Sequence, residues 1–149
     1  MKRLLFFALC LTLTTLFSGP LYAADKKFHF PIKDALESAE AREKLSSNVK
    51  YYFGSQRHPS IRANLGEYVS NKKTNSFAKK NEDACNRAFL SALISFEERA
   101  NSLGANAVVG IESYYKKNVY SSPTHYECHV GAIMAGVALR GKVVKAAGR

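Results

Sequence analysis

Beyond its first 23 residues the sequence lacks a second long apolar run, internal repeats, low-complexity tracts and a recognisable linker. The missing apolar run excludes a stop-transfer segment, and the missing repeats and linkers leave residues 24–149 as a single domain. Only three cysteines are present, which excludes a cysteine-rich zinc module. The segment 131–136 begins and ends with glycine, as the start of a P-loop does. Val137 and Ala138 follow it, in place of the lysine and the serine or threonine that a P-loop requires. No ATP-binding site and no cofactor are therefore expected.

The first residues are typical of a cleavable secretory signal. Two basic residues precede an apolar run over residues 4–17, which is too short to span a bilayer comfortably. A helix-breaking turn follows, and small residues then mark a cleavage site between Ala23 and Ala24. The sequence therefore predicts that residues 1–23 are removed and that the mature protein is periplasmic or secreted.

Positive charge exceeds negative charge over the chain as a whole. The sequence has 22 basic and 12 acidic residues, a net charge of +10, and the loss of Lys2 and Arg3 with the signal leaves +8. Such a charge favours anionic partners such as lipid headgroups or acidic polysaccharide, and it also serves solubility. The candidate anion or partner patch consists of Lys72, Lys73, Lys79, Lys80, Lys116 and Lys117. Nearby aromatic residues would also suit nucleic acid, but an exported protein seldom meets it, so none is expected.

Two cysteines, Cys85 and Cys128, remain after signal removal. An even pair in an oxidising compartment predicts a disulfide, which would stabilise the fold by about 4 kcal/mol on the chain-entropy account. Two alternatives stay open. A free Cys85 at a helix N-terminus would be a reactive thiol, and both sulfurs with His125 and His129 would form a donor set for zinc or copper. Against the metal site, adjacent strand residues such as Cys128 and His129 point to opposite faces.

The strongest helix prediction starts near Asn81, with Asn81 as N-cap and acidic residues in the first turn. Gly104 suits the position after its C-terminus. Its apolar stripe consists of Cys85, Phe89, Ala92, Leu93, Phe96, Ala100 and Leu103. A second helix is expected over residues 32–45.

The remaining chain reads as strands and turns. Strands are expected at 28–30, 49–53, 65–70, 107–115 and 126–145, with polar exposed segments at 54–64, 71–80 and 116–124. The arms 107–115 and 126–145 are expected to pair as a hairpin, with glycines at bulges or close contacts. The order of elements predicts an α+β fold with helices packed on one face of a mostly antiparallel sheet.

Several segments together resemble a group of small exported bacterial proteins whose usual label is "excinuclease ABC" or "excinuclease ATPase subunit". These segments are 52–59, 71–75, 84–93, 104–109 and 128–139. The label implies a nucleic-acid-related role. The sequence departs from that label because it has no P-loop lysine, no cysteine-rich zinc module and too little chain.

A more distant likeness concerns the fold. Ala105–Val108 after the long helix, followed by a glycine-rich strand ending at Leu139, resembles the envelope-stress sensor RcsF and the YbjQ-like domains. The resemblance implies that Cys85 and Cys128 match one of the two disulfides of RcsF. The second pair is missing, since Ser113 and Met134 occupy its places, and so is the lipid anchor. Fold alone does not define function.

No nucleophile motif surrounds the serines near the histidines, so nothing in the sequence favours an enzyme. The sequence therefore predicts an exported, non-enzymatic envelope protein that acts in binding or stress response. Its expected partner is an envelope protein or an anionic glycan or lipid. A periplasmic metal-binding protein is the main alternative.

Overall fold

A computed structural model describes residues 25–148, which form six strands, three α-helices and one short 3-10 helix. In chain order these are β1 (Lys26–Pro31), α1 (Ile32–Glu37), α2 (Ala39–Lys44), β2 (Lys50–Phe53), β3 (Ile61–Asn75), α3 (Asn81–Ser102), β4 (Ala107–Ser113), η1 (Tyr115–Lys117), β5 (His125–Val130) and β6 (Met134–Ala146). The predicted α+β class is confirmed. The predicted signal peptide and its cleavage site at Ala23 and Ala24 lie outside the described residues.

Strand β6 occupies the centre of the sheet. It pairs antiparallel with β3 along one side, and with β5 and then β4 along the other. Strand β1 extends the sheet beyond β5 in an antiparallel pair, and β2 extends it beyond β4 in a parallel pair. The sheet is therefore mostly antiparallel, as predicted.

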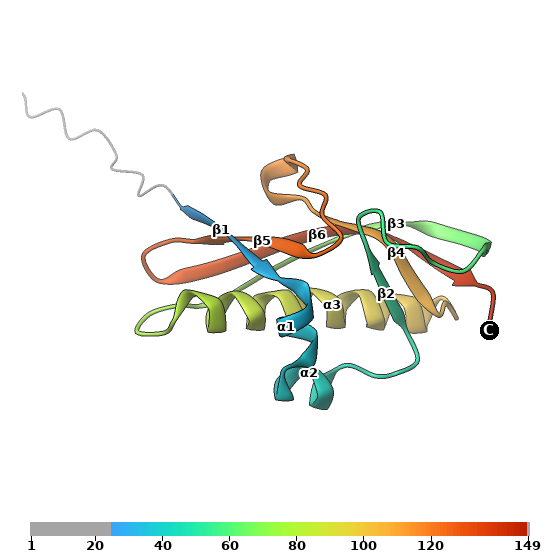
Figure 1. Ribbon diagram of the computed structural model, residues 1–149, viewed down its shortest axis with the longest axis horizontal. Coiled ribbons are helices and arrows are strands. Elements are labelled where there is room, and N and C mark those ends of the chain that lie inside the picture. Colours follow the sequence, from blue (N-terminus) through green and yellow to red (C-terminus); the bar gives the residue numbers. More distant parts are fainter. Residues whose placement is uncertain (1–24, 149) are drawn as a thin grey trace, which may run out of the picture.

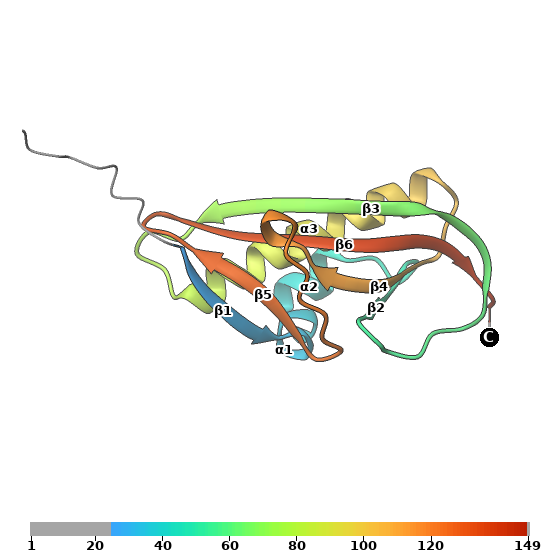
Figure 2. The ribbon, with the colours of Figure 1, turned by 90° about the horizontal axis from the view of Figure 1, so that it is seen from above.

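The helices lie on one face of this curled sheet, which we call the inner face (Figure 1). The long helix α3 runs lengthwise against the central strands, while α1 and α2 lie beside it (Figures 1 and 2). The connection from β4 to β5, which contains η1, crosses the opposite, outer face (Figure 1). The fold thus leaves the two ends of the molecule, and the part of the outer face that this connection does not cover, available for function.

Helix α3 buries its predicted apolar stripe against the inner face. The buried residues are Ala84, Cys85, Ala88, Phe89, Leu90, Ala92, Leu93, Phe96 and Ala100. Gly104 follows the helix with φ of 62°, the left-handed conformation predicted for it. At the other end the prediction is wrong by one residue: Lys80 is the N-cap, without a side-chain cap hydrogen bond, and Asn81 is already helical.

The predicted helix over residues 32–45 is broken at Ser38, which has extended backbone angles. The Ser38 hydroxyl accepts a hydrogen bond from Ala41 N at 3.1 Å and so caps α2. The sequence signal was present, because serine favours N-caps, but the apolar spacing runs through the break and hides it.

The strand expected at 65–70 is longer than predicted, because β3 continues to Asn75, although Asn71, Lys73 and Asn75 are exposed as predicted. Each residue from Glu67 to Asn75 has a partner on β6. Polar side chains do not prevent strand formation here, because the ladder with β6 satisfies the backbone and the side chains can face solvent. Strand β3 is consequently the longest strand of the described sheet.

The predicted antiparallel pairing of residues 107–115 with 126–145 is confirmed for the part of the second arm that forms β6, but that arm is not one continuous strand. The second arm turns back at Gly131, whose N–H donates to Met134 O at 2.8 Å, and becomes the separate strands β5 and β6. Strand β4 pairs with the second half of β6. The expected close contact does occur at Gly141, where a Cβ would lie 2.9 Å from Val108 Cγ1, opposite the register shift in β4.

In the described part of the chain, no helix combines the length and apolar character needed to cross a lipid bilayer.

Candidate functional site

The two cysteines expected in the mature chain come together in the core. Cys85 lies in the first turns of α3 and Cys128 lies on the inner face of β5, and both are fully buried. Their sulfur atoms are 2.04 Å apart and their Cα atoms 5.9 Å apart, the geometry of a disulfide. This link fastens the N-terminal half of α3 to the sheet.

The alternative metal set of Cys85, Cys128, His125 and His129 is not assembled. The sulfurs face each other in the core, whereas His129 lies on the outer face, stacked on the Tyr115 ring. His125 is exposed, and its Nδ1 lies 2.9 Å from the Thr124 hydroxyl. Between residues 25 and 148, no group of three or more histidine, cysteine or acidic side chains is arranged to hold a metal ion.

The six lysines of the candidate anion patch are divided between three elements. Lys72 and Lys73 alternate along β3, Lys79 and Lys80 precede α3, and Lys116 and Lys117 belong to η1. The first four lie toward the same end of the molecule, because the turn that carries Lys79 and Lys80 follows directly on β3. The η1 pair lies over the outer face.

One end of the molecule carries an exposed apolar cluster that sequence reasoning missed. Phe77 is 68% exposed, Ile133 59% and Met134 40%. Phe77 lies in the turn between β3 and α3, and Ile133 lies in the turn between β5 and β6. The two turns are joined because Ser76 N donates to Ile133 O at 2.8 Å. We call Phe77, Ile133 and Met134 the apolar tip.

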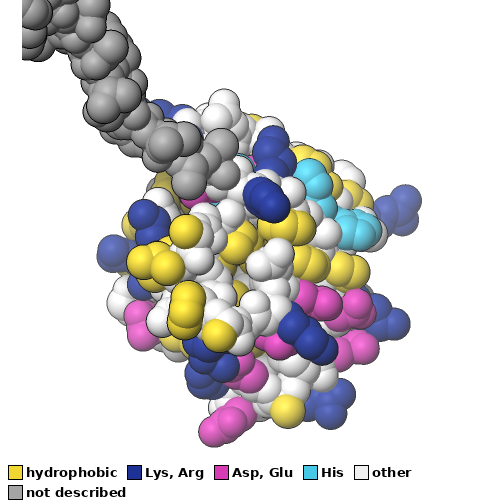
Figure 3. All heavy atoms as spheres, turned by 90° about the vertical axis from the view of Figure 1, so that its left-hand side faces the viewer, with side chains coloured by type: hydrophobic (Ala, Val, Ile, Leu, Met, Phe, Trp, Pro, Cys, Tyr) yellow, Lys and Arg dark blue, Asp and Glu magenta, His cyan; other side chains and the backbone are white. Residues whose placement is uncertain are grey.

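Figure 3 views this end directly and shows hydrophobic side chains grouped near its centre, with Lys and Arg side chains around them. Lys79 is held beside the tip, since its Nζ donates to Asn75 O at 3.2 Å. Acidic Glu82 and Asp83 lie in the first turn of α3 at the same end. The local charge is therefore mixed, with lysines closest in sequence to Phe77.

A second group missed by sequence reasoning is the Glu127 cluster, which consists of Glu127, Lys27, His29 and His129 on the outer face. Glu127 is only 4% exposed. Its carboxylate accepts a hydrogen bond from His129 Nε2 at 2.7 Å and lies 3.4 Å from His29 Nε2 and 3.6 Å from Lys27 Nζ. A buried carboxylate is costly unless it is paired, and here three side chains pair with it.

The surroundings of the Glu127 carboxylate decide its charge. Burial by itself would raise the pKa of Glu127, but the hydrogen bond from His129 and the charges of His129 and Lys27 outweigh it and hold this pKa below its usual range. The carboxylate is therefore ionised at neutral pH.

Tyr115 covers His129 from the solvent side. The two ring centroids are 3.6 Å apart with an interplanar angle of 12°. The Tyr115 hydroxyl donates to Asp25 Oδ2 at 2.6 Å, and this bond, together with partial burial, raises the pKa of Tyr115 to about 12. Beside the rings is a small depression of about 90 Å³ that Lys73 and Met134 also line. The Glu127 cluster and the apolar tip are therefore adjacent, because His129 and Met134 line the same depression.

The signal for the Glu127 cluster was partly visible in the sequence. Alternation places Lys27 with His29 on one face of β1 and Glu127 with His129 on one face of β5. The register of β1 on β5 brings them together, with Lys27 opposite His129 and His29 opposite Glu127. That pairing joins segments about a hundred residues apart and is not encoded in either segment alone.

A larger groove of about 530 Å³ lies on the outer face beside the 54–58 loop, over β4 and β6. Two basic residues, Arg140 and Lys142, line it, and Arg140 is engaged by the Glu112 carboxylate and by the face of the Tyr114 ring, 4.3 Å away. Because Glu67 and Glu112 balance the charges of Arg140 and Lys142, this groove offers an anion less attraction than the lysine-bearing end does.

A comparison with protein families finds no family that matches the sequence, and a comparison with curated proteins finds no similar protein.

Proposed function

We propose that the chain is an exported, non-enzymatic envelope protein that binds an anionic lipid surface through its apolar tip and the flanking lysines. Three features of the sequence support export: the N-terminal signal, the even cysteine pair and the resemblance to small exported bacterial proteins. The likeness to RcsF and YbjQ-like domains supports a place in the bacterial envelope, in the periplasm or outside the cell.

The observation that carries the proposal is the exposure of the apolar tip. Phe77 and Ile133 are held on two turns that protrude together, and each exposes more than half of its surface to water. Full burial of one such side chain contributes about 1.5–3 kcal/mol. Insertion into the interfacial region of a bilayer would recover part of this free energy from each residue.

Electrostatic attraction adds to this apolar contribution. Each lysine near an anionic bilayer contributes about 1 kcal/mol. Lys73, Lys79 and Lys80 supply this charge, and Glu82 and Asp83 oppose it. The apolar residues therefore carry binding and the lysines select an anionic surface. An acidic polysaccharide would engage the lysines but would leave the apolar tip in water, so lipid is the better fit.

The test is binding of the exported protein to vesicles of phosphatidylcholine with and without phosphatidylglycerol, measured by cosedimentation. We expect binding to the anionic vesicles and about a tenfold loss of affinity in the double variant F77S/I133S, since a loss of 1.4 kcal/mol is tenfold. The variant I61S is the matched control, because Ile61 is 42% exposed on β3 at the opposite end of the molecule.

Charge is tested separately with K79E/K80E, which should weaken vesicle binding severalfold and reduce its salt dependence. K33E on α1 is the control. Unchanged binding of F77S/I133S would contradict the proposal. So would tighter binding to dextran sulfate that ignores the F77S/I133S change, since that result would assign the lysines to an acidic polysaccharide.

A further inference from the structure

Strand β3 leaves one of its edges unpaired. Within residues 25–148 it has a strand partner only on the side of β6. From Glu67 to Asn75 the ladder with β6 runs residue for residue, without a bulge. Along such a strand every second residue turns its N–H and C=O away from the existing partner. This stretch therefore presents main-chain donors and acceptors to a further strand.

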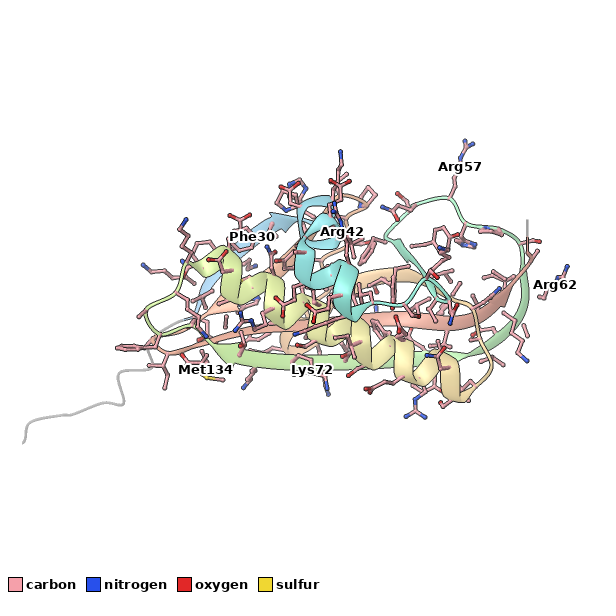
Figure 4. All side chains as sticks on the ribbon, turned by 90° about the horizontal axis from the view of Figure 1, so that it is seen from below. Phe30, Arg42, Arg57, Arg62, Lys72 and Met134 are labelled. Atoms are coloured by element: carbon pink, nitrogen blue, oxygen red, sulfur yellow. A yellow bond between two sulfur atoms is a disulfide. The ribbon has the colours of Figure 1, made fainter. Side chains whose placement is uncertain are left out.

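A groove lies beside this free edge. Its volume is about 350 Å³, and Tyr68 and Ser70 of β3 line it together with Ser95, Phe96 and Arg99 of α3. Figures 2 and 4 both show the C-terminal end of α3 projecting past β3 on the side away from β6. The C-terminal end of α3 therefore lies below the free edge of β3 and extends beyond it. An edge strand beside a helix is an arrangement that receives extended peptides by strand addition.

The groove contains a buried polar atom that lacks a partner. Ser70 is only 5% exposed. Its Oγ is the one buried side-chain nitrogen or oxygen of the described residues that makes no hydrogen bond. A buried hydroxyl in this state costs about 1–3 kcal/mol. A polar group entering the groove would remove that cost, which singles out this part of β3 as a binding site.

Two charged side chains of α3, Glu98 and Arg99, line the groove. The Arg99 guanidinium lies 4.8 Å from the centre of the Tyr68 ring, and it forms no ion pair with another described residue. A guanidinium stacked on an aromatic ring keeps its N–H donors free for a carboxylate. An acidic side chain on the incoming segment would meet this requirement.

We propose that β3 and the C-terminal half of α3 bind an extended segment of another polypeptide, added as a strand along Tyr68–Lys72, with an acidic side chain for Arg99. A second copy of this chain is a poorer occupant. Between Tyr68 and Lys72 the β3 strand of a second copy has no acidic side chain to offer Arg99, and it carries a lysine instead. A single added strand is narrow enough to lie over the projecting end of α3. This site is separate from the apolar tip and does not depend on lipid binding.

The test uses a displayed library of linear ten-residue peptides, selected on the immobilised exported protein. The best enriched peptide is then measured against variants by fluorescence polarisation. We expect enriched peptides to carry an acidic residue, and S95W, which fills the groove, to weaken binding at least tenfold. S91W is the matched control, because Ser91 lies one turn earlier on the same side of α3 and outside the groove.

Two milder variants keep the test decisive if S95W fails to fold. S70A removes the unpartnered hydroxyl, and R99A removes the free guanidinium; each should weaken peptide binding severalfold without lowering thermal stability. Amide hydrogen exchange should slow along Glu67–Asn75 when the peptide binds. The proposal is overturned if no peptide is enriched or if bound peptide leaves exchange in β3 unchanged. It is equally overturned if sedimentation shows a dimer that S95W dissociates.

Discussion

At the scale of single residues, the most consequential side chain is the Glu127 carboxylate. It is buried on the outer face and relies on His129, His29 and Lys27 for its charge balance. A carboxylate whose pKa is lowered by folding stabilises the native state at every pH above its unfolded pKa. Removing one partner of a buried ion pair lowers the free energy of unfolding by more than an exposed ion pair contributes to it. The reason is that the remaining buried charge is left without a partner.

We predict that E127Q lowers the free energy of unfolding by about 2 kcal/mol at pH 7, as expected when a charged hydrogen bond is lost. The stabilisation from Glu127 is complete above its unfolded pKa of about 4.3 and disappears as the pH falls through the lower folded pKa. Urea unfolding at pH 7 and at pH 3 should therefore show that the difference between wild type and variant shrinks in acid.

The control for this prediction is E43Q, because Glu43 is exposed on α2. It should change stability little at either pH. A difference between wild type and E127Q that stays constant from pH 7 to pH 3 would contradict the charged state assigned to Glu127.

At the scale of elements, α3 is the organising unit, since it contacts the central strands and is joined to β5 through Cys85 and Cys128. The bond closes a loop across a sequence separation of 43 residues. Closing that loop reduces the conformational freedom of the unfolded chain. The helix and the sheet are otherwise held together by packing and by side-chain hydrogen bonds, which the Tyr126 hydroxyl donates to Asn86 and the Tyr51 hydroxyl donates to Glu97.

We predict that C85A/C128A lowers the free energy of unfolding by about 4 kcal/mol, the value that chain entropy gives for a loop of this length. Denaturant unfolding with and without reductant measures it. Reductant should destabilise the wild type and leave the variant unaffected. An unfolding midpoint that is equal in wild type and variant would contradict a stabilising role for the bond.

The sequence allowed α3 to be predicted well and the sheet only in part. Helical periodicity is local, so the stripe from Cys85 to Ala100 and the stop at Gly104 could be read directly. Sheet pairing joins distant segments, so neither the union of β1 with β5 nor that of β3 with β6 could be derived from local patterns. The polar residues 71–75 look like a loop until β6 is placed beside them.

The same division applies to the candidate sites. The cysteine pair was predictable from its even number and from the oxidising compartment that the predicted signal implies. The apolar tip was not, because Phe77 and Ile133 are separated by the whole of α3, β4 and β5 and meet only through the bond from Ser76 to Ile133. The groove beside β3 depends on where α3 crosses the sheet, which no residue pattern specifies.

At the scale of the whole molecule, β3, β6 and α3 run lengthwise, so the fold has two distinct ends (Figures 1 and 2). The start of β1 lies at the end that carries the apolar tip, and the C-terminal residues lie at the other end (Figures 1 and 2). Met134 and Arg62 mark these two ends in Figure 4. The predicted signal therefore joins the mature domain at the end proposed to face lipid.

We predict that the protein made with its own N-terminus is exported and begins at Ala24, because a small residue at position 23 suits signal peptidase. Intact-mass measurement of the periplasmic fraction checks this, and A23E should block or shift the cleavage. The control A39E alters an exposed alanine on α2 and should leave processing unchanged. Recovery of the uncut chain from the cytosol alone would contradict the assignment.

The opposite placement of the two termini has a practical use. A sensor chip that holds the protein by its carboxyl terminus would present Phe77 and Ile133 to the flowing sample on every copy. Capture by the amino terminus would press the same side chains against the chip and hide them. Reversing the point of attachment would therefore switch the proposed lipid capture on or off while the amino-acid sequence stays the same.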